Sequence, residues 1–238
     1  MHMSRRSIIR VLKLILAVAV VMIGVYQTAL KPQDTTDSST ADLPTVSYSP
    51  ASEVLQKLPI KGRAPKTGYT RTQFGNGWLD AGGCDVRERI LARDMSNVVY
   101  ESVMQSTNCT VQSCTLQDPY TGKQIMFRRG PVTSGAVQID HVVALSDAWQ
   151  KGAQLLSYEQ RIQLANDPLE LLAVDGSANQ MKSDGDAATW LPANKSFRCN
   201  YIARQIAVKQ KYSLWITRSE YDAMARVLND CPGQVLPS

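Results

Sequence analysis

The first thirty residues constrain the chain most, because they decide the compartment in which the rest must fold. Residues 1–30 contain four basic and no acidic side chains, and the apolar run LILAVAVVMIGV occupies residues 14–25. This pattern is typical of an export signal, whereas a membrane-spanning helix requires about twenty apolar residues. No clean Ala-x-Ala cleavage site follows, so a signal peptide and an N-terminal membrane anchor both stay open. Residues 14–30 would contact the membrane in the second case, and both place the remaining chain outside the cytoplasm.

The next segment has the composition of a linker. Residues 31–50, KPQDTTDSSTADLPTVSYSP, are rich in Ser, Thr, Asp and Pro and show no apolar period. Residues 51–238 then form the predicted domain, which is long enough to bury a core of its own. With 44% hydrophobic and 20% charged residues, the chain is neither disordered nor collagen-like.

The net charge of +5 is concentrated in the leader. Outside residues 1–30 the chain has 22 basic and 21 acidic side chains, a net charge of +1. This balance excludes a uniformly basic nucleic-acid-binding surface but leaves room for a local patch. The chain has two histidines, His2 and His141, so a single histidine is available to the predicted domain.

The five cysteines favour disulfides over a zinc site. They form no C-x-x-C pair, and one histidine cannot complete the usual structural zinc sets. Residues 196–212 have helical apolar spacing, and a capping box at residues 217–220 predicts a second helix. An antiparallel hairpin of these helices would bring Cys199 next to Cys231.

The sequence also predicts a second disulfide, for which no helical hairpin constrains the choice of partners. Cys84–Cys109 is the preferred pair, which leaves Cys114 over, and Cys109–Cys114 competes with it. Disulfides suit an exported domain, because the extracytoplasmic environment is oxidising.

The apolar patterns predict an α+β fold. Strands are expected in the middle of the domain and helices around them, which differs from the alternation of a parallel βαβ sheet. The expected strands are residues 110–117, 124–129, 137–145 and 169–174, and the expected helices are residues 86–104, 196–212 and 217–230 with shorter ones from about residues 157 and 177.

Asp140 and His141 are the candidate chemical residues, because they interrupt the apolar strand VQIDHVVAL. On a straight strand His141 shares a face with Val137, Ile139 and Val143, as a buried core histidine would. Asp140, however, is a charge in an apolar strand and must be paired, hydrated or bound to a metal. Adjacent strand residues point to opposite faces, so the two share a site only if the strand bends or ends there.

A second strand and then Asn179-Gln-Met-Lys182-Ser183-Asp184 at a helix start follow this strand. The arrangement resembles the HNH nucleases, also called ββα-metal or His-Me finger nucleases. The resemblance implies a ββα-metal core in which His141 is the general base and Asp140 and Asn179 hold a divalent metal. The second histidine of the HNH label is missing, so water and phosphate oxygens would complete the metal site.

The resemblance extends over most of residues 51–238. It includes YTRTQFGNGWLD at residues 69–80, the sequence from Cys84 to Arg87, residues 118–130 and residues 166–192. These segments are similar to exported HNH proteins related to the C-terminal domain of GmrSD-type restriction enzymes. The implied function is an exported endonuclease that hydrolyses DNA, with RNA as the alternative substrate; the sequence indicates no protein partner.

The residue types suit this chemistry. A histidine with a pKa near 6.5 accepts a proton from water at neutral pH, and oxygen ligands favour Mg²⁺ or Mn²⁺ over metals that prefer thiolates. Further cations and aromatic residues are weaker candidates, each with an ordinary surface, ion-pair or core role as its alternative. Lys182, Asp184 and Arg87 are candidates for contacting phosphate or supporting the site, Arg93, Arg128 and Arg129 for lining a groove, and Trp78, Trp149 and Trp190 for stacking on bases.

Two other functions remain possible at this point. An inactive module with the same fold would bind nucleic acid or serve a structural role without cleaving. A Ser-His-Asp hydrolase would also need His141, but the chain contains no G-x-S-x-G sequence.

Overall fold

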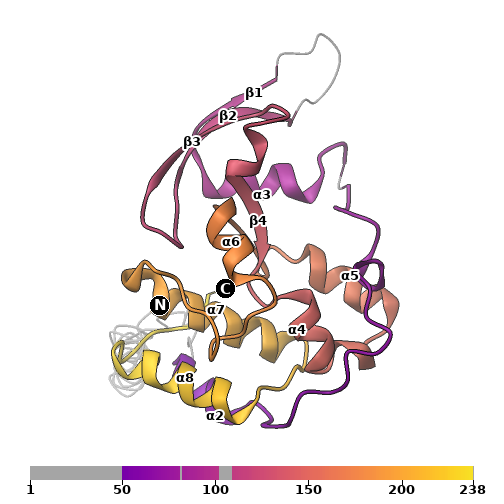
Figure 1. Cartoon of the computed structure of the whole chain (residues 1–238), viewed down its shortest axis with the longest axis vertical. Helices are drawn as coiled ribbons and strands as arrows, with labels where there is room; N and C mark the ends of the chain where they lie inside the picture. The colour runs from indigo at the N-terminus through magenta and orange to yellow at the C-terminus, as the bar shows by residue number, and fades with distance from the viewer. Residues whose placement is uncertain (1–49, 81, 102–108, 238) are drawn as a thin grey trace, which may run out of the picture. The chain divides into compact units, whose positions relative to one another are not determined.

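The computed structural model describes residues 50–80, 82–101 and 109–237 (Figure 1). The predicted leader and all but the last residue of the predicted linker lie outside the described residues, so both stay predictions. Within the described ranges no helix is long and apolar enough to cross a membrane.

The described chain is a mixed α+β structure, as the sequence predicts. Its helices are α2 (Ala51–Lys57), α3 (Val86–Asp94), α4 (Leu145–Gln150), α5 (Tyr158–Asn166), α6 (Gly176–Lys182), α7 (Arg198–Lys211) and α8 (Arg218–Asn229), with short 3-10 turns that include η1 (Arg71–Phe74) and η2 (Ser134–Ala136). Its strands are β1 (Ser96–Tyr100), β2 (Val111–Gln117), β3 (Gln124–Arg128), β4 (Val137–His141) and β5 (Leu171–Asp175).

The strands form two antiparallel sheets. One has the order β1-β2-β3, and the other is the pair β4-β5, in which Asp140 lies opposite Leu172 and His141 opposite Leu171. Helix α6 begins directly after β5, so the pair is followed by a helix that packs on both of its strands. Figure 1 shows α6 beside β4, with the three-stranded sheet at one end of the described part of the chain.

The predicted helix over residues 86–104 is wrong in its second half. Helix α3 ends at Asp94, and β1 begins at Ser96. Val98 and Val99 have β-branched side chains, which pack well on a strand, and Asn97 has a positive φ of 53° that an α-helix does not allow. Pairing with β2 therefore overrides the apolar spacing of this segment.

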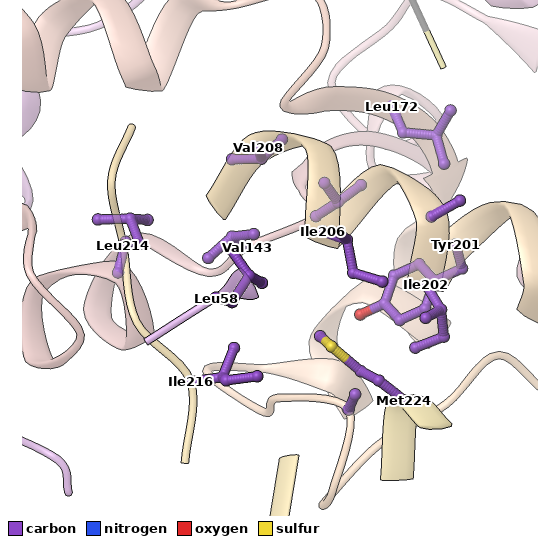
Figure 2. Packing of buried hydrophobic residues seen from close by; sticks show 14 of the residues in the cluster. Leu58, Val143, Leu172, Tyr201, Ile202, Ile206, Val208, Leu214, Ile216 and Met224 are labelled. Atoms are coloured by element: carbon purple, nitrogen blue, oxygen red, sulfur yellow. The ribbon is translucent and has the colours of Figure 1, made fainter. Parts of the chain in front are cut away.

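Helix α7 lies at the centre of the larger hydrophobic core. Tyr201, Ile202, Ile206 and Val208, all in the predicted apolar stripe of this segment, are fully buried. Figure 2 shows them packed with side chains from α8, β5, the α7–α8 connection and the segments that follow α2 and β4. A second cluster joins α3 to both sheets through Ile90, Leu91, Leu116, Phe127 and Ile139, among others.

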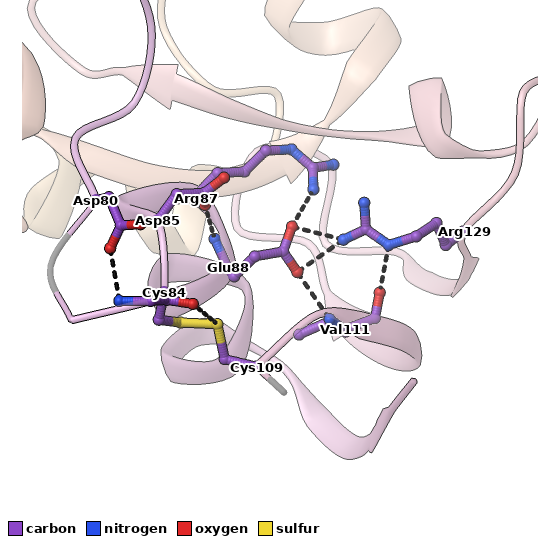
Figure 3. Close-up of a disulfide and its surroundings, with 9 residues drawn as sticks. Asp80, Cys84, Asp85, Arg87, Glu88, Cys109, Val111 and Arg129 are labelled. Atoms are coloured by element: carbon purple, nitrogen blue, oxygen red, sulfur yellow. Dashed lines mark hydrogen bonds and ion pairs between the residues drawn. A yellow bond between two sulfur atoms is a disulfide. The ribbon is translucent and has the colours of Figure 1, made fainter. Parts of the chain in front are cut away.

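Both preferred disulfides are present. Cys199 and Cys231 are bonded with their Cα atoms 6.3 Å apart, at the ends of the α7–α8 hairpin that the sequence predicts. Cys84 is bonded to Cys109, with a Cα–Cα distance of 5.7 Å (Figure 3). Cys114 is free and buried, and burial raises the pKa of its thiol to about 11. The competing Cys109–Cys114 pairing is therefore wrong.

A buried network of charges joins α4 to α7, α8 and the segment after α6. Lys151 contacts Asp147, Asp186 and Glu220 at 2.8, 2.8 and 2.6 Å, and Lys209 reaches Glu220 at 2.9 Å. These five side chains are almost completely buried. The partly exposed Arg63 adds a third cation through Asp147 and Asp186, so the charges of the network balance. The network fixes α4, which begins four residues after His141.

Gly176 permits the close contact between the first turn of α6 and η2. A Cβ atom at this position would lie 2.1 Å from the carbonyl oxygen of Gly135 and 3.2 Å from Nε2 of Gln138. No real Cβ is found so close to a backbone oxygen, so a larger residue would force η2 and β4 away from α6.

We expect Gly176→Ala to lower the free energy of unfolding by at least about 2 kcal/mol, because the added methyl group overpacks a backbone contact. Urea unfolding measures this difference. Gly62→Ala is the matched control, since a Cβ there meets nothing within 4 Å. Equal effects of the two substitutions would contradict the role assigned to Gly176.

Candidate active site

One pocket of about 550 Å³ brings the principal predicted site residues together. Its lining residues include Asp140, His141, Asn179 and Arg87, together with Arg71 and Gln138. Strand β4 ends at His141, so the alternation of a regular strand no longer applies beyond this residue. Asp140 and His141 are both paired with β5 and their side chains have different partners, but both residues are among those that line the pocket.

The imidazole of His141 has a defined orientation. Its Nε2 lies 3.0 Å from the carbonyl oxygen of Ala165. A carbonyl oxygen only accepts hydrogen bonds, so we assign the ring proton to Nε2, which leaves Nδ1 with a free lone pair. The ring also stacks on Trp78, with the centroids 5.6 Å apart and the planes 9° from parallel.

His141 is held in its neutral form. Burial lowers its pKa from the ordinary 6.5 to about 3, and the positive charge of Arg71 contributes in the same direction. At neutral pH the imidazole is therefore uncharged. The sequence-based expectation of an ordinary histidine pKa did not include this burial.

Asp140 is a buried carboxylate with two strong partners. Nζ of Lys182 lies 2.9 Å from its Oδ1, and the hydroxyl of Tyr120 donates to its Oδ2. Burial raises the pKa of Asp140, while Lys182 and Tyr120 act in the opposite direction. Lys182 also donates to the backbone carbonyl of His141 at 2.8 Å. One ammonium group thus fixes both residues at the end of β4.

Lys182 does not line the pocket. Its side chain is fully buried and paired with Asp140, so it is not an exposed group for phosphate. Its place follows from the spacing of residues on β4 and α6. Gln138 and Asp140 are two residues apart and share one face of β4. Their partners Asn179 and Lys182 are three residues apart and share one face of α6.

Asn179 completes this pairing of strand and helix. Its Nδ2 donates to Oε1 of Gln138 at 2.9 Å. The amide nitrogen is thereby used, and Oδ1 has no partner among the described residues. Asn179 thus offers a free carboxamide oxygen in the pocket that Asp140 also lines.

These donors fit a hard divalent ion with few protein ligands. Within the described ranges, no group of three or more His, Cys, Asp or Glu side chains is suited to hold a metal. The pocket instead offers one carboxylate and one carboxamide, both oxygen donors. A carboxylate has about four lone-pair sites, so Asp140 keeps acceptor capacity beyond its bonds to Lys182 and Tyr120. Mg²⁺ is often bound by one or two carboxylates, with water and phosphate oxygens completing its shell.

Arg87 belongs to an ion-pair cluster on one wall of the pocket. Its Nη1 lies 2.9 Å from Oε1 of Glu88, and the same carboxylate binds Arg129 at 2.5 Å (Figure 3). Asp85 caps α3 by accepting from the backbone N–H of Glu88. Two guanidinium groups therefore share the carboxylate of Glu88.

The remaining candidates lie outside the pocket. None of the three arginines Arg93, Arg128 and Arg129 lines the pocket. Arg93 pairs with Asp94 and donates to backbone carbonyls, and Arg129 donates to the carbonyl of Val111. Arg128 is exposed on β3. Asp184 accepts from Lys66 and Ser146, each at 3.2 Å. Trp149 packs with Tyr69 and Phe74, and Trp190 with Tyr120 and Tyr201, which are core roles.

Arg71, Gln138 and Tyr120 also belong to the site, although no pattern discussed above singles them out. Arg71 is in the resembling segment YTRTQFG, and Tyr120 is in the turn Asp118-Pro-Tyr-Thr-Gly122. Gln138 is the polar residue two before Asp140 on a strand otherwise apolar up to that point. A search for polar residues on the Asp140 face of the strand would have found it.

Comparison with known proteins finds a family match that covers most of the described residues. The family model "GmrSD restriction endonucleases, C-terminal domain" matches residues 85–227, which include the whole pocket except Arg71. An "Uncharacterized secreted protein" of Arthroderma benhamiae is 34% identical over 187 residues, or 78% of this chain and 86% of that protein. No solved structure matches the chain significantly.

We expect Lys182→Met to lower the free energy of unfolding by about 3–5 kcal/mol, because it leaves the buried carboxylate of Asp140 without its cation. Chemical unfolding provides the measurement. The double variant Asp140→Asn with Lys182→Met should lose less than the single variant, since no buried charge is then left unpaired. Additive losses would argue against the pairing.

We also expect stability to depend on His141 in acid. An unfolded chain protonates this residue below about pH 6.5, whereas the folded chain keeps it neutral down to about pH 3. Between these values the unfolded state binds more protons, so the free energy of unfolding decreases as the pH falls, by up to about 1.4 kcal/mol per pH unit. Unfolding in EDTA should show a shallower decrease for His141→Gln; equal slopes would contradict the burial of a neutral imidazole.

Proposed function

Since the chain belongs to the family of the GmrSD restriction endonuclease C-terminal domain, we propose that it is an exported, metal-dependent endonuclease that hydrolyses phosphodiester bonds in DNA. RNA is the alternative substrate. The observation that carries the proposal is the contact of His141 Nε2 with the carbonyl oxygen of Ala165 at 3.0 Å, which assigns the ring proton to Nε2 and leaves Nδ1 as the acceptor. This ring lines the same pocket as two oxygen donors and two arginines.

His141 acts as the general base in this proposal. Its Nδ1 accepts a proton from the attacking water, while the bond from Nε2 to the Ala165 carbonyl becomes stronger as the ring gains positive charge. The stack on Trp78 and the contact with Ala165 fix the plane of the ring before substrate arrives. Such positioning lowers the entropic cost of reaching the reactive geometry.

Asp140 and Asn179 are the residues that would hold Mg²⁺ or Mn²⁺. When bound, the ion supplies positive charge next to the oxygen that becomes negative as the phosphodiester bond breaks. Lys182 and Tyr120 orient the Asp140 carboxylate from the side away from the pocket, and Gln138 orients the Asn179 amide.

We assign β4, β5 and α6 to the ββα-metal (His-Me finger) class, to which the HNH nucleases belong. The antiparallel pair followed directly by a helix supports this assignment, as do Asp140 and His141 at the end of the first strand and Asn179 on the helix. The absence of a second histidine near α6 is the departure from the HNH pattern.

Export is supported by two findings outside the site. The relative from Arthroderma benhamiae is named as a secreted protein, and two disulfides are typical of proteins in oxidising compartments. The domain is therefore an extracellular, nuclease-related protein in this proposal. A transmembrane anchor has no support of this kind.

One observation favours a second candidate, an inactive nucleic-acid-binding module. Both carboxylate oxygens of Asp140 already have donors, Lys182 and Tyr120, and an ion must share that carboxylate with them. A protein with only the binding function would keep the positively charged pocket and show no dependence on a divalent metal.

The decisive experiment is plasmid nicking by the full chain with Mg²⁺ or Mn²⁺, with EDTA, and with His141→Ala. We expect cleavage that EDTA abolishes and that falls at least about a hundredfold in His141→Ala, the usual size of a general-base effect. Equal cleavage by both proteins would remove His141 from the mechanism. If the chain cleaves neither DNA nor RNA with any divalent metal, the inactive binding module becomes the favoured function.

Asn179→Ala tests the ligand assignment separately. We expect it to raise the Mg²⁺ concentration needed for half-maximal cleavage by about tenfold or more, since half of the protein ligand set is lost. Asn200→Ala, at an exposed position on α7, is the matched control and should leave the metal requirement unchanged.

A further inference from the structure

Arg71 is the pocket residue to which the family match assigns nothing, because the match begins at residue 85. It is the first residue of η1, in the segment before α3. The residue is exposed, and its guanidinium has no hydrogen bond or ion pair within the described ranges. Most other arginines around the site are bound differently: Arg87, Arg93 and Arg129 each pair with a carboxylate.

Arg71 shares two cavities with the imidazole of His141. Both residues line the large pocket that contains Asp140 and Asn179. Both also line a smaller cavity of about 210 Å³, whose other walls include Phe74, Trp78 and Ala165. A side chain common to both cavities lies where they meet, next to the ring that the proposed reaction uses.

The charges around the large pocket favour an anion. Its lining contains two arginines, Arg71 and Arg87, against one carboxylate, Asp140. Asp140 is already paired with Lys182, and the carboxylate that binds Arg87 is shared with a further arginine. The local balance is therefore positive although the chain outside residues 1–30 has a net charge of only +1.

We propose that Arg71 binds the phosphodiester phosphate that reacts beside His141, with Arg87 as the second cation of the same anion site. The inference rests on the proposed function and names a substrate-binding residue for it. A guanidinium is suited to this role because its planar donors match two phosphate oxygens at once. An arginine without a protein partner is free to make both bonds.

The test measures binding of the full chain to a short DNA duplex in EDTA, so that cleavage does not interfere, over a series of salt concentrations. We expect Arg71→Gln to weaken binding about tenfold. The slope of log K against log salt should become shallower by about 0.9, as for the loss of one phosphate contact. Arg71→Lys should keep the slope of the wild type and lose part of the affinity, since the charge stays and the paired donors do not.

Arg218→Gln is the matched control. It removes an equal charge from an exposed position on α8, outside the pocket, and should change neither affinity nor slope. Arg71→Gln should unfold at the wild-type urea midpoint, because the guanidinium has no partner to lose. A changed slope at unchanged stability is not produced by a merely structural residue.

The outcomes separate this inference from the proposed function. If the wild type binds and cleaves DNA while Arg71→Gln has the affinity and slope of Arg218→Gln, the inference alone is overturned. If the wild type neither binds nor cleaves nucleic acid, the proposed function and the inference both fail. In cleavage assays with Mg²⁺ we expect Arg71→Gln to raise KM by about tenfold.

Discussion

The buried ion pair between Asp140 and Lys182 is the interaction on which the site depends. A carboxylate inside an apolar strand is strongly unfavourable without a partner, and Lys182 supplies that partner from the neighbouring helix at 2.9 Å. The same ammonium binds the carbonyl of His141. The end of β4 and the last turn of α6 are therefore held at a fixed separation, and the imidazole, carboxylate and Asn179 amide keep their relative positions without any bound ligand.

A second set of buried charges supports this arrangement by fixing the position of α4. Lys151 and Lys209 contact Asp147, Asp186 and Glu220 in the buried part of the protein. Removing any one partner would leave an uncompensated charge, so the network tolerates little displacement of α4 relative to α7 and α8. Because α4 follows β4 almost directly, its position limits how far His141 can move.

Much of the fold could be predicted from local sequence, and the contacts of the site could not. The capping box at Thr217 is present, and α5 begins with another at Ser157, because such caps depend on neighbouring residues alone. The α7–α8 disulfide followed from two helix predictions and one turn. The end of α3 was missed because pairing with β2 decides it. The roles of Tyr120 and Arg71 depend on the packing of distant segments, which periodicity does not report; the burial that lowers the pKa of His141 has the same origin.

The Cys84–Cys109 disulfide makes the structure sensitive to its redox surroundings. It lies directly before the cap of α3, and three residues after Cys84 is Arg87, on the wall of the pocket. Under reducing conditions this bond does not persist, so the wall then lacks its covalent support. The complete pocket wall therefore depends on oxidising surroundings.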